Sequence, residues 1–174
     1  MTDGGYRLPS VVCRQAWRTY LMIPITTLKQ IPLFSFLSED ALERIQGMCE
    51  ERRYQRGQAI FSEGEVADKL YVLGQGVVAI RMQQRPGGDS AMVAALREKG
   101  MMMGWSAVIG PGRYTASAVC MDDVTAIAID GRQLRQLIHE DCDAGVVLLE
   151  AIANVIASRL QATRSQIIGT PPAS

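Results

Sequence analysis

The chain has 174 residues, of which 48% are apolar and 21% charged, a composition typical of a globular domain with a substantial core. Eighteen Lys and Arg residues balance eighteen Asp and Glu, so a basic nucleic-acid-binding surface over the whole domain is not expected. The longest apolar run, residues 91–96, is far shorter than the roughly 20 residues of a membrane-spanning helix. Since the N-terminus also lacks the pattern of a signal peptide, we expect a cytoplasmic protein without a membrane span.

The composition also argues against metal sites and common catalytic groups. His139 is the single histidine, and the four cysteines include no CxxC pair. Zinc sites with several histidines and iron–sulfur motifs need more ligands than this. No nucleophile–base pair or pair of carboxylates is evident either. We therefore expect no metal, no cofactor and no enzyme activity.

Residues 1–27 are expected to form an N-terminal arm and a helix over 11–22. Arg14 and Arg18 lie on one face of that helix at a spacing of four residues. Its apolar side consists of Val12, Ala16, Trp17 and Tyr20. We expect this side to pack on the domain or on a second subunit; a membrane surface and a partner protein are the alternatives.

In the middle of the chain, the spacing of apolar residues changes from that of a helix to that of β-strands. Ser38, followed by two acidic residues, predicts the N-cap of a helix over about 38–51. From residue 52 apolar residues alternate and glycines recur at short intervals, which predicts strands at 58–61, 69–73, 77–83, 91–97, 115–120 and 124–129. Many short strands at this spacing are typical of a sandwich or barrel.

Helical spacing returns after Asp130, which is predicted to cap a short helix, and a longer helix follows over about 143–168. In the long helix, apolar residues recur at steps of three and four. They are Leu149, Ile152, Ile156 and Leu160. This seam predicts a homodimer formed through the long helix.

Two segments carry a more specific pattern. They are residues 31–42 (IPLFSFLSEDAL) and residues 57–78 (GQAIFSEGEVADKLYVLGQGVV). Both resemble the cyclic-nucleotide-binding-domain superfamily, which includes catabolite-activator-like (CRP/FNR-like) bacterial regulators. The resemblance implies a mixed α+β fold: a jelly-roll-like β-roll of about eight strands, flanked by N-terminal helices and a long C-terminal helix. It places the β-roll domain at 28–142 and a dimerisation helix with its tail at 143–174.

The resemblance also implies a ligand site, the phosphate cassette, at residues 103–117 (MGWSAVIGPGRYTAS). In the family, a glycine precedes a Glu that accepts the ribose hydroxyl, and an Arg further on binds the phosphate. Here Gly104 matches the glycine, Trp105 replaces the Glu, Tyr114 occupies the Arg position, and Arg113 lies one place early. The candidate ligand-binding residues are Gly104, Trp105, Ser106, Ala107, Arg113, Tyr114, Thr115 and Ala116.

Several of these residues allow two interpretations. Trp105 and Tyr114 either form an aromatic wall for a flat ligand or fill the emptied pocket. Arg113 either reaches an anion or is a charge on a solvated loop. Ser106 and Thr115 either donate to a ligand or cap the local backbone. The departures from the family pattern predict that cyclic AMP and cyclic GMP are not bound in the usual way, and leave a small anionic or aromatic molecule as the ligand class.

The combined pattern predicts a cytoplasmic bacterial regulatory module that acts in signal transduction through an unidentified protein partner. The alternative is a ligand-free structural or interaction domain that uses the fold as a dimerisation scaffold. Regulators of this family often carry a helix-turn-helix domain after the long helix. The sequence ends six residues after Ile168, so we expect a stand-alone domain that does not bind DNA.

Overall fold

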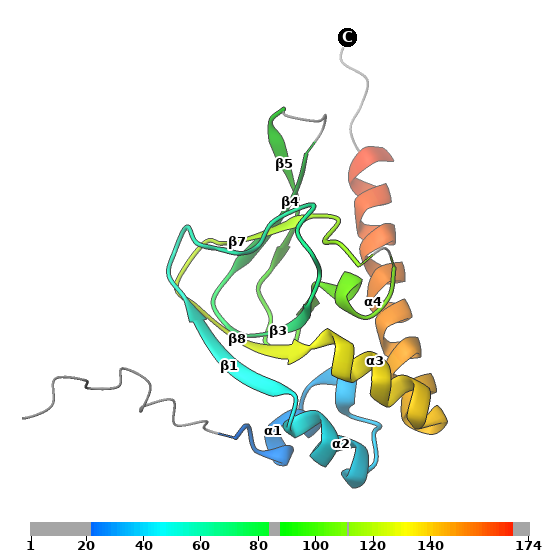
Figure 1. Cartoon of the computed structure of the whole chain (residues 1–174). Coiled ribbons are helices and arrows are strands. Elements are labelled where there is room, and N and C mark those ends of the chain that lie inside the picture. Colours follow the sequence, from blue (N-terminus) through cyan, green and yellow to red (C-terminus); the bar gives the residue numbers. More distant parts are fainter. Residues whose placement is uncertain (1–21, 84–87, 111, 169–174) are drawn as a thin grey trace, which may run out of the picture.

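The computed structural model describes residues 22–83, 88–110 and 112–168, with side chains as far as residue 161. The helix predicted at 11–22 lies outside this range except for Met22. Three short helical segments come first, then strands, then two helices (Figure 1). The helical segments are α1 (Ile25–Lys29), the 3₁₀ turn η1 (Pro32–Phe34), α2 (Glu39–Gln46), the 3₁₀ turn η2 (Trp105–Ala107), α3 (Gly131–Glu140) and α4 (Cys142–Ile168).

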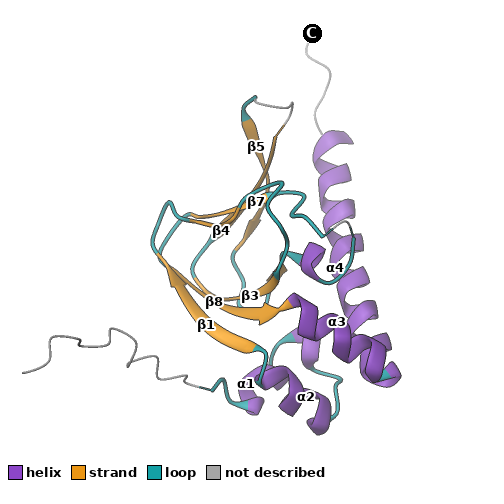
Figure 2. Cartoon of the chain, in the orientation of Figure 1, coloured by secondary structure: helices purple, strands orange, loops and turns teal. Residues whose placement is uncertain are grey.

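The strands form two four-stranded antiparallel sheets that curve around a common interior (Figure 2). They are β1 (Cys49–Tyr54), β2 (Ala59–Phe61), β3 (Lys69–Gln75), β4 (Val78–Gln83), β5 (Ser90–Leu96), β6 (Met102–Met103), β7 (Ser117–Cys120) and β8 (Val124–Asp130). The first sheet has the order β1-β8-β3-β6 and the second β2-β7-β4-β5. The helices gather along one side of this roll, so the mixed α+β β-roll with flanking helices is confirmed.

The apolar residues divide into two cores on opposite faces of the first sheet. Along β8, Ala126 and Ala128 face the interior of the roll, whereas Ile127 and Ile129 face the helices. The helix-side core includes buried leucines of α1, α2, α3 and α4, so these helices are held on the sheet by one continuous apolar cluster. The small alanines on the inner face leave room for the large aromatic side chains that fill the roll.

The predicted helix caps are present. The Ser38 hydroxyl accepts a hydrogen bond from the Ala41 N–H at 3.2 Å, and the Asp130 carboxylate accepts one from the Gln133 N–H at 2.9 Å. The first cap starts α2 and the second starts α3. They therefore set the points where the chain enters each helix.

The predicted end of the helix at 38–51 was wrong. α2 ends at Gln46, and residues 49–54 form β1 instead. Within β1, alternate residues turn toward the roll, and the inward ones include Glu50 and Arg52 rather than apolar side chains. This strand is polar because charged groups pair with one another on its inner side, and apolar alternation therefore did not reveal it.

The inward charges of β1 form an ion-pair cluster with a lysine of β3, which lies beyond β8 in the same sheet. Glu50 Oε1 lies 2.5 Å from Arg52 Nη2 and 3.2 Å from Lys69 Nζ on β3. The Glu50 and Lys69 side chains are only 20% and 19% exposed. Burial by itself would raise the pKa of Glu50, but the hydrogen bonds from Lys69 and Arg52 outweigh it and hold that pKa below its ordinary value.

This cluster predicts an acid-sensitive contribution to folding. Because the folded pKa of Glu50 is depressed, the stabilisation is fully present above the unfolded value of 4.5 and is lost as the pH falls through the folded value. We expect Glu50→Gln to lower the free energy of unfolding at neutral pH by about 1–3 kcal/mol and to flatten its pH dependence below about pH 4.5. Denaturant unfolding across this range measures both effects.

The matched control is Glu51→Gln, since Glu51 pairs with Arg53 on the exposed face of the same strand. The control should leave the pH dependence almost unchanged. Equal pH profiles for Glu50→Gln and the parent protein would contradict the role given to the inner cluster.

Candidate functional site

The cassette begins at a backbone turn that only glycine fits well. Gly104 has φ +76°, in the left-handed region, and precedes the one-turn helix η2. A Cβ atom at this position would approach the Lys69 carbonyl oxygen to 3.0 Å and the Tyr114 ring to 3.2 Å. The expected tight turn into a short helix is therefore present, with a neighbouring aromatic ring packed directly against it.

Tyr114 fills the inside of the cassette. Its ring stacks on Phe61 with centroids 4.0 Å apart, and only 4% of the residue is exposed. The hydroxyl donates a hydrogen bond to the Lys69 carbonyl oxygen at 2.9 Å and accepts one from the Lys69 N–H at 3.2 Å. Burial raises the pKa of Tyr114 to about 12, so the phenol is neutral at physiological pH.

Little empty space remains around this ring. The cavity that Gly104, Trp105, Ser106 and Tyr114 help to line has a volume of about 30 Å³. That is roughly the volume of one water molecule, whereas pockets for small-molecule ligands have volumes of about 300–1,000 Å³. The pocket-filling interpretation of Tyr114 agrees with this geometry.

Trp105 lies at the edge of the cassette, beside α4, and is partly buried. The Arg159 guanidinium of α4 lies over the indole with its carbon 4.7 Å from the ring centroid, a cation–π contact. Arg159 also donates a hydrogen bond to the Met102 carbonyl oxygen. Burial lowers the pKa of Arg159 to about 10, which leaves the side chain protonated at neutral pH.

The remaining candidate residues separate into an inner and an outer group. Ser106 and Ala107 are buried in η2, whereas Thr115 is exposed and Ala116 is half-buried. Arg113 is exposed, and its Nη1 donates to the Gly64 carbonyl oxygen at 2.7 Å, so it ties two loops together. Of the two interpretations of Arg113, this contact favours the loop charge.

Arg159 is the site residue that the sequence did not reveal. Arg159 lies 54 residues beyond Trp105 in the chain, and only the packing of α4 on the roll brings the two together. One signal was available, because an arginine interrupts the apolar positions along the buried side of that helix. A charge at such a position indicates a specific polar or aromatic partner.

The four residues of the predicted dimer seam differ in their exposure to solvent. Ile152 is completely buried in the helix-side core of its own subunit, so it was wrongly placed on an exposed seam. Ile156 is half-buried, and Leu149 and Leu160 are 41% and 61% exposed. The exposed apolar positions instead follow the register of Val146, Leu149, Ala153, Ile156 and Leu160.

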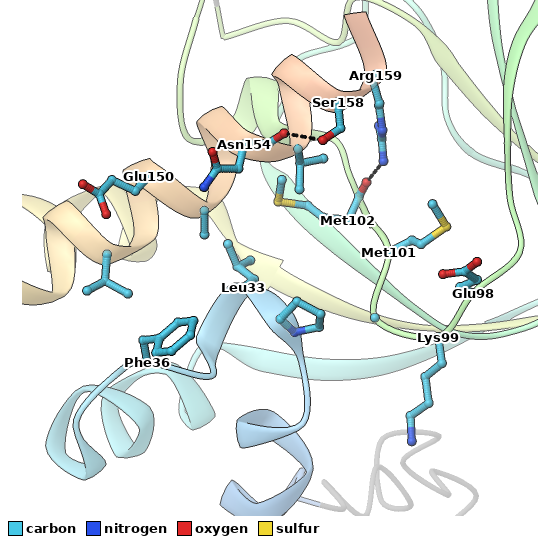
Figure 3. Close-up of a pocket in the computed structure, with 15 residues that line it drawn as sticks. Leu33, Phe36, Glu98, Lys99, Met101, Met102, Glu150, Asn154, Ser158 and Arg159 are labelled. Carbon is cyan, nitrogen blue, oxygen red and sulfur yellow. Dashed lines mark hydrogen bonds between the residues drawn. The ribbon is translucent and has the colours of Figure 1, made fainter. Parts of the chain in front are cut away.

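A larger hollow lies outside the roll, between η1, β6 and α4 (Figure 3). Its volume is about 710 Å³, and apolar side chains form most of its surface. Leu33, Met101, Met102, Val147, Ala151 and Val155 are among them. We call this hollow the α4 groove. It is separate from the small cavity in the cassette, although Arg159 borders both.

Within the described ranges, no group of three or more His, Cys, Asp or Glu side chains is placed to hold a metal ion. Of the helices in the same part of the chain, none combines the length and the apolar character needed to cross a bilayer.

Comparison with known proteins places this geometry in a family. The model of the cyclic nucleotide-binding domain matches residues 51–141, which is more than half of the chain. The chain therefore belongs to the cyclic nucleotide-binding domain family, and its relatives and structural neighbours include CRP-like regulators.

Individual relatives agree with this assignment. The cGMP-dependent protein kinase isozyme 2 (forms cD5/T2) of Drosophila melanogaster is 33% identical over 113 residues, 64% of this chain and 12% of the kinase. The CRP-like cAMP-activated global transcriptional regulator of Mycobacterium tuberculosis is 25% identical over 135 residues, 78% of this chain and 58% of the regulator. The chain thus spans less than two thirds of either relative.

A solved structure supports the fold over most of the chain. It is a protein of Geobacter metallireducens classed with cyclic nucleotide-binding proteins, with a TM-score of 0.72 and 29% identity. The match covers 80% of this chain and 99% of that protein. The family model, the relatives and this structure together identify the chain as a cyclic nucleotide-binding-like regulatory domain.

The contact between Trp105 and Arg159 gives a direct test of the site. We expect a double-mutant cycle of Trp105→Ala and Arg159→Ala to give a coupling energy of about 0.5–2 kcal/mol, because each substitution removes the same cation–π contact. Urea unfolding of the four proteins provides the free energies. Trp105→Ala combined with Ser158→Ala, on the neighbouring helix position, should be additive; a cycle with Arg159 that is equally additive would contradict the contact.

Proposed function

We propose that this chain is a regulatory module of the cyclic nucleotide-binding family whose cassette does not bind cyclic AMP or cyclic GMP in the usual way and which acts through a protein partner. The observation that carries the proposal is the filled cassette: Tyr114 occupies the position of the phosphate-binding Arg, and about 30 Å³ of cavity remains beside it. A cytoplasmic location and the absence of enzyme activity are part of the same proposal.

The loss of binding free energy caused by Trp105 and Tyr114, which replace the family's Glu and Arg, supports weak binding of cyclic nucleotides. A hydrogen bond to a charged group contributes roughly 1.5–3 kcal/mol, and both the acidic and the basic ligand of a usual cassette are replaced here. Since each 1.4 kcal/mol is tenfold in affinity, the loss amounts to about 10²–10⁴-fold. A nucleotide would also have to displace the Tyr114 ring from Phe61 and from the backbone of Lys69.

The contact between the cassette and α4 gives the proposed module a route for a signal. Any event that moves Trp105 changes the surface on which Arg159 lies, and Arg159 is part of the long helix. A small anionic or aromatic ligand at the cassette, or a partner bound to α4, would each shift this contact. The second candidate function, a ligand-free dimerisation scaffold, is favoured by the filled pocket together with the exposed apolar positions of α4.

Calorimetry tests the nucleotide part of the proposal. We expect no binding of cyclic AMP or cyclic GMP in the low-micromolar range. We expect Trp105→Glu combined with Tyr114→Arg to increase the affinity at least about 100-fold, because it restores one hydrogen-bonding charge on each side of the cassette and removes the filling ring.

The control for this gain is Trp105→Gln combined with Tyr114→Met, which opens the pocket without adding charge. The control should remain as weak as the parent protein. Low-micromolar binding by the parent would overturn the proposal, and the lack of any gain in the charged variant would overturn the role assigned to these two positions.

The proposed homodimer uses the exposed side of α4. Val146, Leu149, Ala153, Ile156 and Leu160 follow one another at alternating steps of three and four, the spacing of a coiled-coil seam. Val146 is 57% exposed, so three large apolar side chains of this seam project into solvent from one subunit. Pairing with the same seam of a second copy would remove them from water.

Light scattering tests the dimer. We expect the parent protein to have the mass of a dimer and Leu149→Glu combined with Leu160→Glu to have that of a monomer, because four carboxylates would meet in the paired seam. Both positions are exposed, so the subunit itself should remain folded. Val66→Glu combined with Met121→Glu changes exposed apolar residues elsewhere and should leave the dimer intact; a monomeric parent protein would exclude the seam.

A further inference from the structure

The α4 groove is large enough to hold a peptide segment or a small molecule. α4 forms one wall with Val147, Ala151 and Val155, and η1 with β6 forms the opposite side (Figure 3). Its volume of about 710 Å³ lies within the range of protein sites that enclose an apolar group. At its edge, the Phe36 side chain is 85% exposed. A large aromatic side chain in water beside an open apolar hollow indicates a surface that something covers.

The charged residues on the rim of the groove indicate the charge of the segment that covers it. Glu98 and Glu150 both border the groove, and Lys99 points away from α4 (Figure 3). The remaining cation, Arg159, is turned inward onto Trp105 and the Met102 carbonyl oxygen. The open rim therefore presents carboxylates around an apolar floor, and it complements a segment with one apolar face and basic side chains.

The chain itself contains such a segment, outside the described residues. Residues 11–21 contain no Asp or Glu, and their basic side chains are Arg14 and Arg18. Their apolar side chains include Val12, Trp17 and Tyr20. We propose that residues 11–21 dock in the α4 groove of their own subunit, with the apolar side against α4 and η1 and the arginines beside Glu98 and Glu150.

The length of residues 11–21 and the length of the α4 groove are compatible with this docking. The described chain starts at Met22, which is 65% exposed, and ten residues later Pro32 forms part of the groove. Eleven residues span about 16 Å as a helix and up to about 36 Å when extended. The groove follows α4 from Val147 to Arg159, a helical length of about 18 Å.

Docking leaves the proposed dimer seam free. The groove uses positions 147, 150, 151, 154, 155, 158 and 159 of α4, whereas the seam uses 146, 149, 153, 156 and 160. At 3.6 residues per turn these sets lie on opposite flanks of the buried Ile152. The proposal therefore does not depend on the homodimer or on the state of the cassette.

Fluorescence of Trp17 tests the docking in the full chain. Trp105→Phe keeps an aromatic ring for Arg159 and leaves Trp17 as the single tryptophan. We expect a short-wavelength emission from this protein, and a shift to the wavelength of a water-exposed indole when Phe36→Ser or Ala151→Glu is added. Val66→Ser, which changes an exposed residue outside the groove, is the matched control and should cause no shift.

Charge reversal and proteolysis complete the test. Glu98→Lys combined with Glu150→Lys should also shift the emission, and adding Arg14→Glu with Arg18→Glu should reverse that shift. In the parent, docking should slow tryptic cleavage after Arg14 and Arg18 at least about tenfold relative to the Phe36→Ser protein, which corresponds to about 1.4 kcal/mol.

Three results would overturn the proposal. The first is a water-exposed Trp17 emission in the single-tryptophan parent, or one that no groove variant changes. The second is protection that disappears on dilution, which would indicate a segment supplied by a second copy. The third is a shift that appears only with phosphatidylglycerol vesicles, which would indicate a membrane surface instead.

Discussion

The position of one buried ring, that of Tyr114, determines the state of the whole cassette. The ring is held from two sides, by the face of Phe61 and by both backbone groups of Lys69. The edge of the ring would lie only 3.2 Å from a Cβ atom of residue 104, so the ring packs closely because that residue is glycine. A small, polar or mobile side chain at 114 would leave the interior of the roll open. The stacked phenol closes it and is stabilised by hydrogen bonds that a hydrated pocket would weaken.

The long helix α4 then connects this closed interior to the outside of the molecule. Its buried side contributes Leu148 and Ile152 to the core shared with α1, α2 and α3. Arg159, further along, turns over Trp105 at the edge of the cassette. A cation–π contact of this kind contributes less free energy than core packing. The core residues that α4 buries, Ala144, Leu148 and Ile152, all precede Arg159, so its strongest packing lies toward its N-terminal end.

Two neighbouring surfaces of α4 are apolar and face solvent in the described structure. One flank carries Leu149 and Leu160, and the other borders the α4 groove. A helix with apolar residues on nearly every side has more than one packing partner, because a single contact buries only one stripe. The proposed regulation, the proposed dimer and the proposed docking of residues 11–21 each use a different part of this helix. A module that communicates through a partner gains from this arrangement, since changes at one flank alter the helix that the other flank shares.

Local sequence rules predicted much of this architecture. Ser38 and Asp130 start helices because a side chain that accepts a backbone N–H determines the first turn wherever it occurs. Gly104 adopts a positive φ for a similarly local reason, and the apolar spacing after residue 142 is sufficient for a long helix. These helix starts and the helical spacing depend on neighbours within four residues, whereas residues 31–42 and 57–78 carried the resemblance to the family.

The tertiary structure decided the features that depend on distant neighbours. β1 is a strand because its backbone pairs along its whole length with the distant β8, and Ile152 is a core residue because α4 packs with that side on the roll. Arg159 reaches Trp105 for the same reason. The sequence by itself therefore determined most of the elements, the fold class and the unusual residues of the cassette. Only the folded chain decided that Tyr114 closes the pocket and that an arginine from α4 lies at its edge, because both depend on contacts between segments that are far apart along the chain.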